Sequence, residues 1–90
     1  MTSGRRYAIT IKRSAEREMD DLPADTFDRV VQAILTLEGD PRRRGSKKLR
    51  GVDEYRLRVG AYRVLYTVDD TRRIIEVVAV GHRRDVYKNM

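Results

Sequence analysis

The sequence predicts a small α+β domain in which a hairpin of two helices packs on one face of a mostly antiparallel β-sheet. Three observations predict this fold. Apolar residues recur with helical spacing between residues 27 and 35, polar and apolar residues alternate near the N-terminus, and three strand-like segments follow residue 53. The 90 residues are expected to form one domain, residues 1–90, with one modest core.

The N-terminal third predicts one strand and two helices. Alternation from Tyr7 to Lys12 predicts a first strand of about six residues. Ser14 is expected to cap a short helix with the apolar residues Ala15, Met19 and Leu22 on one face. Pro23 suits the first turn of a second helix. The sequence Gly-Asp-Pro at 39–41 should end this helix. Its apolar face consists of residues at helical spacing: Phe27, Val30, Val31, Ile34 and Leu35.

The remaining segments predict a basic loop and three strands. The sequence RRRGSKKLR at 42–50 has six cations in nine residues. It is expected to be a solvated loop, or a rim that grips phosphates without reading bases. Strands are expected near residues 54–59, 62–68 and 73–80, with tight turns at 60–61 and 69–71. A short helix or an irregular tail should follow at 84–89. The helices would cover one sheet face and leave the other open.

Charge and composition narrow the classes of partner. Residues 1–40 carry 6 basic and 8 acidic side chains, whereas residues 41–90 carry 14 and 6, within a net charge of +6. This asymmetry favours a polyanionic partner, either nucleic acid or an acidic protein. There is no cysteine and there is one histidine, so we expect no metal and no cofactor. No long apolar stretch or signal-peptide core occurs, which predicts a cytoplasmic protein without membrane contact.

The open sheet face is the candidate site. Arg56 and Arg58 alternate with apolar residues, so both should point away from the core. Arg63 follows the turn at 60–61, and Arg83 and Tyr87 follow the last strand. Cations on one sheet face beside a tyrosine suggest a site for an RNA phosphate, although a solvated sheet face gives the same alternation.

The histidine and the remaining tyrosines have structural interpretations. His82 is a candidate general base because imidazole exchanges protons near neutral pH. Strand alternation, however, puts it on one face with Val78 and Val80, which is typical of a structural histidine. Alternation also places four residues of one strand in the core rather than on a stacking platform: Tyr62, Val64, Tyr66 and Val68.

Three segments resemble the RelE toxins of bacterial and archaeal toxin–antitoxin modules: LRG (49–51), YRLRVGAYRVLYTVDD (55–70) and VVAVGHRRDVY (77–87). The similarity is most specific in GAYRVLY and GHRRDVY, and the order of elements agrees over nearly the whole chain. The resemblance implies a type II toxin that is a ribosome-dependent, metal-independent endoribonuclease and cleaves messenger RNA. Its implied partners are the ribosome, messenger RNA and a cognate antitoxin that is RelB-like or otherwise acidic.

The resemblance also implies the site residues. Two cations on the strand after LRG, an arginine opening the next strand, an arginine after the last strand and a C-terminal tyrosine match Arg56, Arg58, Arg63, Arg83 and Tyr87. Arg84 is an alternative to Arg83, because the spacing to the tyrosine varies in the family. Arg84 and the cations of the basic segment are the expected RNA-binding residues: Arg42, Arg43, Arg44, Lys47, Lys48 and Arg50.

The implied chemistry is attack by a 2′-hydroxyl on the adjacent phosphate. The best-known members carry lysines where this chain has Arg56 and Arg58. Because arginine keeps its proton, these two side chains would clamp phosphate rather than shuttle protons. Tyr87 combines a titratable proton with an aromatic face, so it could act as the base or stack on a nucleotide. As a tail aromatic, it could instead pack on the sheet.

Two alternatives stay open. ParE toxins share the fold, act on DNA gyrase and do not carry the nuclease residues, so Arg63, Arg83 and Tyr87 together favour RelE. A degenerate RelE-like protein that binds the ribosome or antitoxin without cutting is the other alternative. The arginine-for-lysine differences on the strand keep that interpretation open.

Overall fold

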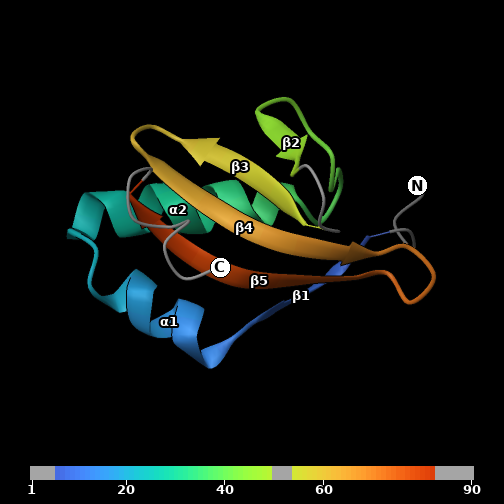
Figure 1. The fold of residues 1–90 in the computed structure, drawn as a ribbon, viewed down its shortest axis with the longest axis horizontal. Helices are drawn as coiled ribbons and strands as arrows, with labels where there is room; N and C mark the ends of the chain where they lie inside the picture. Colours follow the sequence, from blue (N-terminus) through green and yellow to red (C-terminus); the bar gives the residue numbers. More distant parts are fainter. Residues whose placement is uncertain (1–5, 50–53, 83–90) are drawn as a thin grey trace.

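The computed structural model describes residues 6–49 and 54–82, which form two helices and one five-stranded sheet (Figure 1). The elements follow in this order: β1 (Ala8–Ile11), α1 (Arg13–Asp20), α2 (Ala24–Thr36), β2 (Ser46–Lys48), β3 (Tyr55–Val59), β4 (Tyr62–Asp69) and β5 (Ile74–His82). The expected tail at 84–89 lies outside the described residues. Within the described ranges, neither helix is long and apolar enough to cross a membrane.

The sheet is mixed, with strand order β1-β5-β4-β3-β2. β1 pairs parallel to β5, and the other neighbours pair antiparallel. The expected α+β class with a mostly antiparallel sheet is confirmed. The crossover through α1 and α2 separates β1 from the hairpins that follow, which explains why its pairing with β5 is the parallel one.

Both helices begin differently from the sequence-based expectation. The predicted cap at Ser14 is wrong, because α1 begins at Arg13 and its N-cap, Lys12, makes no side-chain capping bond. Pro23 is the N-cap of α2 rather than a residue of its first turn, and its carbonyl accepts a hydrogen bond from the Phe27 N–H at 2.8 Å. α2 ends at Thr36, ahead of the Gly-Asp-Pro sequence, and the residue after it, Leu37, is fully buried.

The main core lies between the helices and one face of the sheet, which we call the covered face. β3 contributes Leu57, and β4 contributes Val64 and Tyr66. The helices and the other strands supply the remaining buried members: Ala15, Met19, Val30, Ile34, Leu37, Ile75, Val77 and Val80. Both helical faces that the apolar spacing predicted therefore contribute to this core.

Part of the basic segment is a strand, which the sequence did not predict. Ser46–Lys48 forms β2 at the sheet edge, where Ser46 lies opposite Leu57 and Lys48 opposite Tyr55. Gly45 has φ of +94° and turns the chain into this strand. Lysines on an edge strand also discourage pairing with other chains, so a charged segment is compatible with this position.

A β-bulge in β5 changes the expected alternation of its side chains. Leu65 lies opposite Ala79, but Tyr66 lies opposite Val77, so Val78 is the extra residue. The predicted shared face of Val78, Val80 and His82 is therefore wrong for Val78. That side chain instead packs with a small cluster of Leu65, Ala79 and Leu49 on the other side of the sheet, which we call the open face.

Candidate nucleic-acid interface

Four cations lie together on the open face, and we call this group the cation face. Lys47 of β2 lies opposite Arg56 of β3, and Arg58 of β3 lies opposite Arg63 of β4. Directly opposed residues project to the same side of a sheet. Arg56 and Arg58 also alternate with the buried Leu57, so they point away from the main core, as the sequence predicted.

The pairing of like charges is the distinctive feature of this group. A like-charged pair directly opposite across strands destabilises a sheet, in the range of about 0.2–1 kcal/mol. The two rows are neighbours, because Arg56 and Arg58 are two residues apart, about 7 Å along a strand. Together the rows make a positive surface on which a bound polyanion reduces the repulsion.

Arg63 is the fixed member of the cation face. Its exposed fraction is 6%, and among the described residues it is the one charged side chain in the buried class. Nη1 donates to the carbonyl oxygens of Tyr62 at 3.0 Å and Gly60 at 3.3 Å. These bonds compensate for burying a cation. By contrast, Arg58 is exposed and Arg56 is half-buried.

The β3–β4 turn provides the acceptors for Arg63. Gly60 has φ of +61°, a left-handed conformation that residues with a Cβ adopt reluctantly. The tight turn at 60–61 is therefore confirmed. The two carbonyl groups belong to Gly60 in the turn and to Tyr62 beside it. The same hairpin therefore places Arg63 opposite Arg58 and also holds the Arg63 guanidinium.

His82 lies away from the cation face. It is opposite Tyr62, and the two rings meet edge-to-face with centroids 5.7 Å apart at 79°. Tyr62 is on the covered face, since it alternates with Val64 and Tyr66 of the core, whereas Arg63 lies opposite Gly81. The backbone of the sheet thus separates the imidazole of His82 from the cations.

Arg42 also lies on the covered face, at the opposite end of β4 from Arg63. Its Nη1 and Nη2 donate to Oδ1 and Oδ2 of Asp70 at 3.1 and 2.8 Å. Its Nε donates to the Tyr55 hydroxyl at 3.0 Å, and its guanidinium carbon lies 5.3 Å from the centre of that ring. Tyr55 in turn stacks on the buried Tyr66 at 5.6 Å.

The charges of this cluster influence one another. Hydrogen bonds from Arg42 and then from Tyr7 lower the pKa of Asp70 to about 2. The Tyr7 hydroxyl donates to Asp70 Oδ1 at 2.6 Å, and this bond raises the pKa of Tyr7 above its ordinary value. Asp70 likewise raises the pKa of Arg42. No local sequence pattern indicates this cluster, because its members are far apart in the chain.

The other cations of the basic segment have separate positions. Arg43 donates from Nε to the Arg44 carbonyl at 2.9 Å and from Nη1 to the Thr36 hydroxyl at 3.0 Å. Arg44 and Lys48 are exposed, and Lys48 is on the opposite side of β2 from Lys47. Of the described cations in this segment, the strand register therefore places Lys47 on the cation face.

The remaining sequence-predicted site residues cannot be placed against this group. Arg50, Arg83, Arg84 and Tyr87 lie outside the described residues, so their roles stay predictions. Three of the expected catalytic residues are described and lie together: Arg56, Arg58 and Arg63. Within the described ranges, no cluster of three or more His, Cys, Asp or Glu side chains could hold a metal ion.

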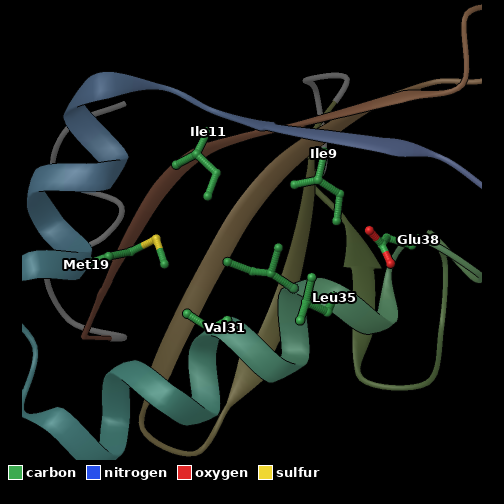
Figure 2. A pocket seen from close by; sticks show the side chains of 7 residues that line it. Ile9, Ile11, Met19, Val31, Leu35 and Glu38 are labelled. Carbon is green, nitrogen blue, oxygen red and sulfur yellow. The ribbon is translucent and has the colours of Figure 1, made fainter.

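An apolar groove lies on the covered side, where β1, α1 and α2 meet. Figure 2 shows Ile9 and Ile11 of β1 and Met19 of α1 facing Val31 and Leu35 of α2. Ile34 and Glu38 complete the lining. Its volume of about 270 Å³ is smaller than that of a typical ligand pocket, so it suits a few side chains of another protein.

Comparisons with known proteins agree with this fold. The family model described as the ParE toxin of type II toxin–antitoxin system, parDE, matches residues 9–87. The putative toxin RelE1 of Methanocaldococcus jannaschii is 32% identical over 88 residues, 93% of this chain and 98% of the relative.

Two solved complexes contain chains similar to this one. The archaeal RelE–RelB complex from Pyrococcus horikoshii gives a TM-score of 0.80 at 28% identity, with 90% of this chain and 99% of the other covered. The RelBE2 toxin–antitoxin complex from Mycobacterium tuberculosis gives 0.79 at 30%, with 87% and 99% covered.

Proposed function

The chain belongs to the ParE toxin family of type II toxin–antitoxin systems and is a RelE-like toxin, and we propose that it is a metal-independent endoribonuclease that cleaves messenger RNA on the ribosome. The cation face carries the proposal. A fixed, buried Arg63 lies opposite an exposed Arg58, and the Lys47–Arg56 pair is beside them. The names RelE1 and RelE–RelB of its relatives add support.

The reaction we propose is attack of a ribose 2′-hydroxyl oxygen on the adjacent phosphorus. The bond from phosphorus to the 5′-oxygen breaks, which leaves a 2′,3′-cyclic phosphate and a 5′-hydroxyl end. Negative charge builds on the non-bridging oxygens in the transition state. The planar guanidinium of Arg63 is suited to this charge, because its donors match phosphate oxygens and its position is set before substrate binds.

Proton transfer requires a different group. Arginine keeps its proton, so Arg56, Arg58 and Arg63 can stabilise charge but not act as the base. His82 is on the other side of the sheet, in edge contact with Tyr62. Tyr87 therefore remains the proposed base that takes the 2′-hydroxyl proton. The 5′-oxygen that leaves takes up a proton from water, since arginine cannot supply one.

Ribosome dependence follows from this division of tasks. A surface of phosphate-binding cations holds the backbone of RNA without selecting one bond. In-line attack also requires the 2′-hydroxyl and the leaving oxygen to lie on opposite sides of the phosphorus. The ribosome presents messenger RNA in a set conformation, so we propose that it supplies the orientation that the toxin lacks.

The proposed partner that neutralises the toxin is its antitoxin. The cation face would attract an acidic segment, since complementary charge speeds and orients association. The apolar groove offers a second contact for leucine-sized side chains, and Leu35 at its border is 45% exposed. The two similar complexes, which pair RelE-type toxins with RelB-type antitoxins, support this proposal.

The second candidate function is the poisoning of DNA gyrase. It is favoured by one observation, the match to a family model that carries the name ParE. A gyrase poison needs no preset phosphate ligand, so the buried Arg63 is the feature that this alternative leaves without a role.

The test compares purified toxin on translating ribosomes with toxin on the same naked messenger RNA, and maps 5′ ends by primer extension. Cleavage on ribosomes that Arg63→Ala abolishes and Lys48→Ala spares supports the proposal. Equal cleavage of naked RNA would contradict ribosome dependence. No cleavage in either reaction would contradict the nuclease proposal, and a DNA damage response on induction would then favour the gyrase alternative.

A further inference from the structure

We propose that Arg42 is a positioning residue rather than an RNA ligand, and that it sets Lys47 on the cation face as a further phosphate-binding residue. The inference rests on the proposed function and deepens it, because it assigns separate tasks to cations that look equivalent in the sequence. It comes from two features, the strand register of β2 and the cluster around Asp70.

The strand register places Lys47 on the cation face. It lies directly opposite Arg56, so its ammonium group extends the cation face by one strand toward the sheet edge. Lys48, its neighbour in sequence, lies opposite Tyr55 on the other side of the same strand. A phosphate bound between Lys47 and Arg56 would adjoin one bound between Arg58 and Arg63.

The register that places Lys47 on the cation face has little support within β2 itself. β2 has three residues, and its pairing with β3 is the lateral contact that sets its register. A slip of one residue would move Lys47 to the covered side. An edge strand this short needs anchors outside the ladder, because strands usually have about five or six residues.

Arg42 supplies such an anchor on the covered side. Its three nitrogens donate to Asp70 and to Tyr55, which ties the chain entering β2 both to the β4–β5 turn and to β3. Next to it, the Pro41 carbonyl accepts a 2.7 Å hydrogen bond from the buried Tyr66 hydroxyl. The Gly45 carbonyl then accepts from the Arg58 N–H at 3.1 Å, which fixes the start of β2.

The same contacts argue against a direct role of Arg42 in RNA binding. A bidentate pair with a carboxylate uses the fork of donors that would otherwise hold a phosphate. The guanidinium also covers the ring of Tyr55, which belongs to the covered face. Arg42 and the cation face are therefore on opposite sides of the sheet.

The first experiment measures the binding of a fluorescent, fully 2′-O-methylated single-stranded RNA, which cannot be cleaved through its 2′-oxygen. Affinity is followed against salt concentration for Lys47→Ala and for the matched control Lys48→Ala. Loss of one phosphate contact lowers the slope of log affinity against log salt by about 0.7. We expect this change for Lys47→Ala and a smaller one for Lys48→Ala.

The second experiment separates charge from position. Asp70→Asn and the control Asp69→Asn each raise the net charge by one, at adjacent residues where β4 ends and the turn begins. Asp69 accepts a hydrogen bond from the Arg72 N–H at 2.9 Å, which an asparagine oxygen can also accept. If Arg42 positions Lys47, Asp70→Asn weakens binding to the level of Lys47→Ala, while Asp69→Asn does not weaken it.

Arg42→Lys provides the conservative test. It keeps the charge but loses the two-pronged bond to Asp70, so it should bind like Lys47→Ala. The double variant Arg42→Lys with Lys47→Ala should bind RNA no more weakly than Lys47→Ala alone, because both changes remove the same phosphate contact. Circular dichroism at the assay temperature checks that each variant is folded.

The outcomes distinguish this inference from the proposed function. RNA binding with the expected slopes, but no cleavage on ribosomes, supports the inference and contradicts the nuclease proposal. Cleavage on ribosomes with equal slopes for Lys47→Ala and Lys48→Ala overturns the inference alone. Tighter binding by Asp70→Asn, or wild-type binding by Arg42→Lys, overturns the role of Arg42. Absence of binding by the unmodified protein at low salt overturns both parts.

Discussion

Replacement of Arg63 by alanine should greatly reduce cleavage while the toxin remains folded. The structure allows an estimate of both the loss of cleavage rate and the loss of folding stability. A fixed donor to a transition-state oxyanion is worth about 100- to 1,000-fold in rate, or roughly 2.7–4 kcal/mol. Arg63 meets the description because its exposed fraction is 6% and two carbonyl groups hold its Nη1.

The effect on folding should be much smaller than the effect on rate. The variant loses two hydrogen bonds from a charged donor, at about 1.5–3 kcal/mol each in a fully buried setting. Gly60 is exposed and Tyr62 is half-buried, so water can replace much of that bonding. Removing the repulsion with Arg58 returns up to about 1 kcal/mol. A net loss of about 1 kcal/mol would lower Tm by roughly 4–8 °C.

The assay is single-turnover cleavage with toxin in saturating excess over the ribosome complexes. Binding of toxin to these complexes is measured separately. Arg58→Ala is the comparison on the opposing strand, and Lys48→Ala, on the other side of the sheet, is the control. Because Arg58 is exposed, we expect it to behave as an exposed charge, worth about 0.2–1 kcal/mol, at most about fivefold. Wild-type turnover by Arg63→Ala would refute the role of the buried guanidinium.

Four further predictions concern stability and the antitoxin. Tyr66→Phe should destabilise the fold by about 1–3 kcal/mol in urea unfolding, because the buried Pro41 carbonyl loses its 2.7 Å bond; unchanged stability would contradict this. The pKa of Asp70 is depressed to about 2, so its stabilisation relative to Asp70→Asn should be full above its ordinary value of 3.8 and shrink as pH falls toward 2. The raised pKa of Tyr7 predicts the opposite dependence at alkaline pH: its contribution to stability is present at neutral pH and is lost as the pH rises through that pKa. Urea midpoints that do not vary with pH would contradict the predictions for Asp70 and Tyr7. Leu35→Asp should weaken antitoxin binding about 10- to 150-fold in titration calorimetry, corresponding to about 1.5–3 kcal/mol of lost leucine burial, with unfolding nearly unchanged; binding equal to that of Gln32→Asp would exclude the groove.

The β3–β4 hairpin was predictable because its signals are local. Period-two alternation around Leu57 set the faces of Arg56 and Arg58, and a glycine at position 60 marked the turn. The pairing of Arg58 with Arg63 then follows from a two-residue turn. Three of the four members of the cation face, Arg56, Arg58 and Arg63, were therefore readable from a single stretch of sequence.

The rest depends on contacts between distant residues. The bulge at Val78 comes with a hydrogen bond from the Val80 N–H to Glu18 Oε1 at 2.8 Å, a partner on α1. Arg42 and Asp70 are 28 positions apart, and no local pattern pairs them. A run of cations predicts solvation, yet Lys47 and Lys48 form an edge strand because β3 offers an unpaired edge there.

The separation of the two surfaces constrains how an antitoxin can neutralise this toxin. The cation face is on the open side of one sheet, whereas the apolar groove is on the covered side, beside the edge strand β1. A partner confined to the groove would hold the toxin but leave Arg58 exposed to RNA. A partner confined to the cation face would compete directly with RNA, but salt would weaken its grip. Neutralisation that is both tight and resistant to salt therefore requires one polypeptide that passes around an edge of the sheet. That polypeptide would place apolar side chains in the groove and acidic ones against Arg58 and Lys47.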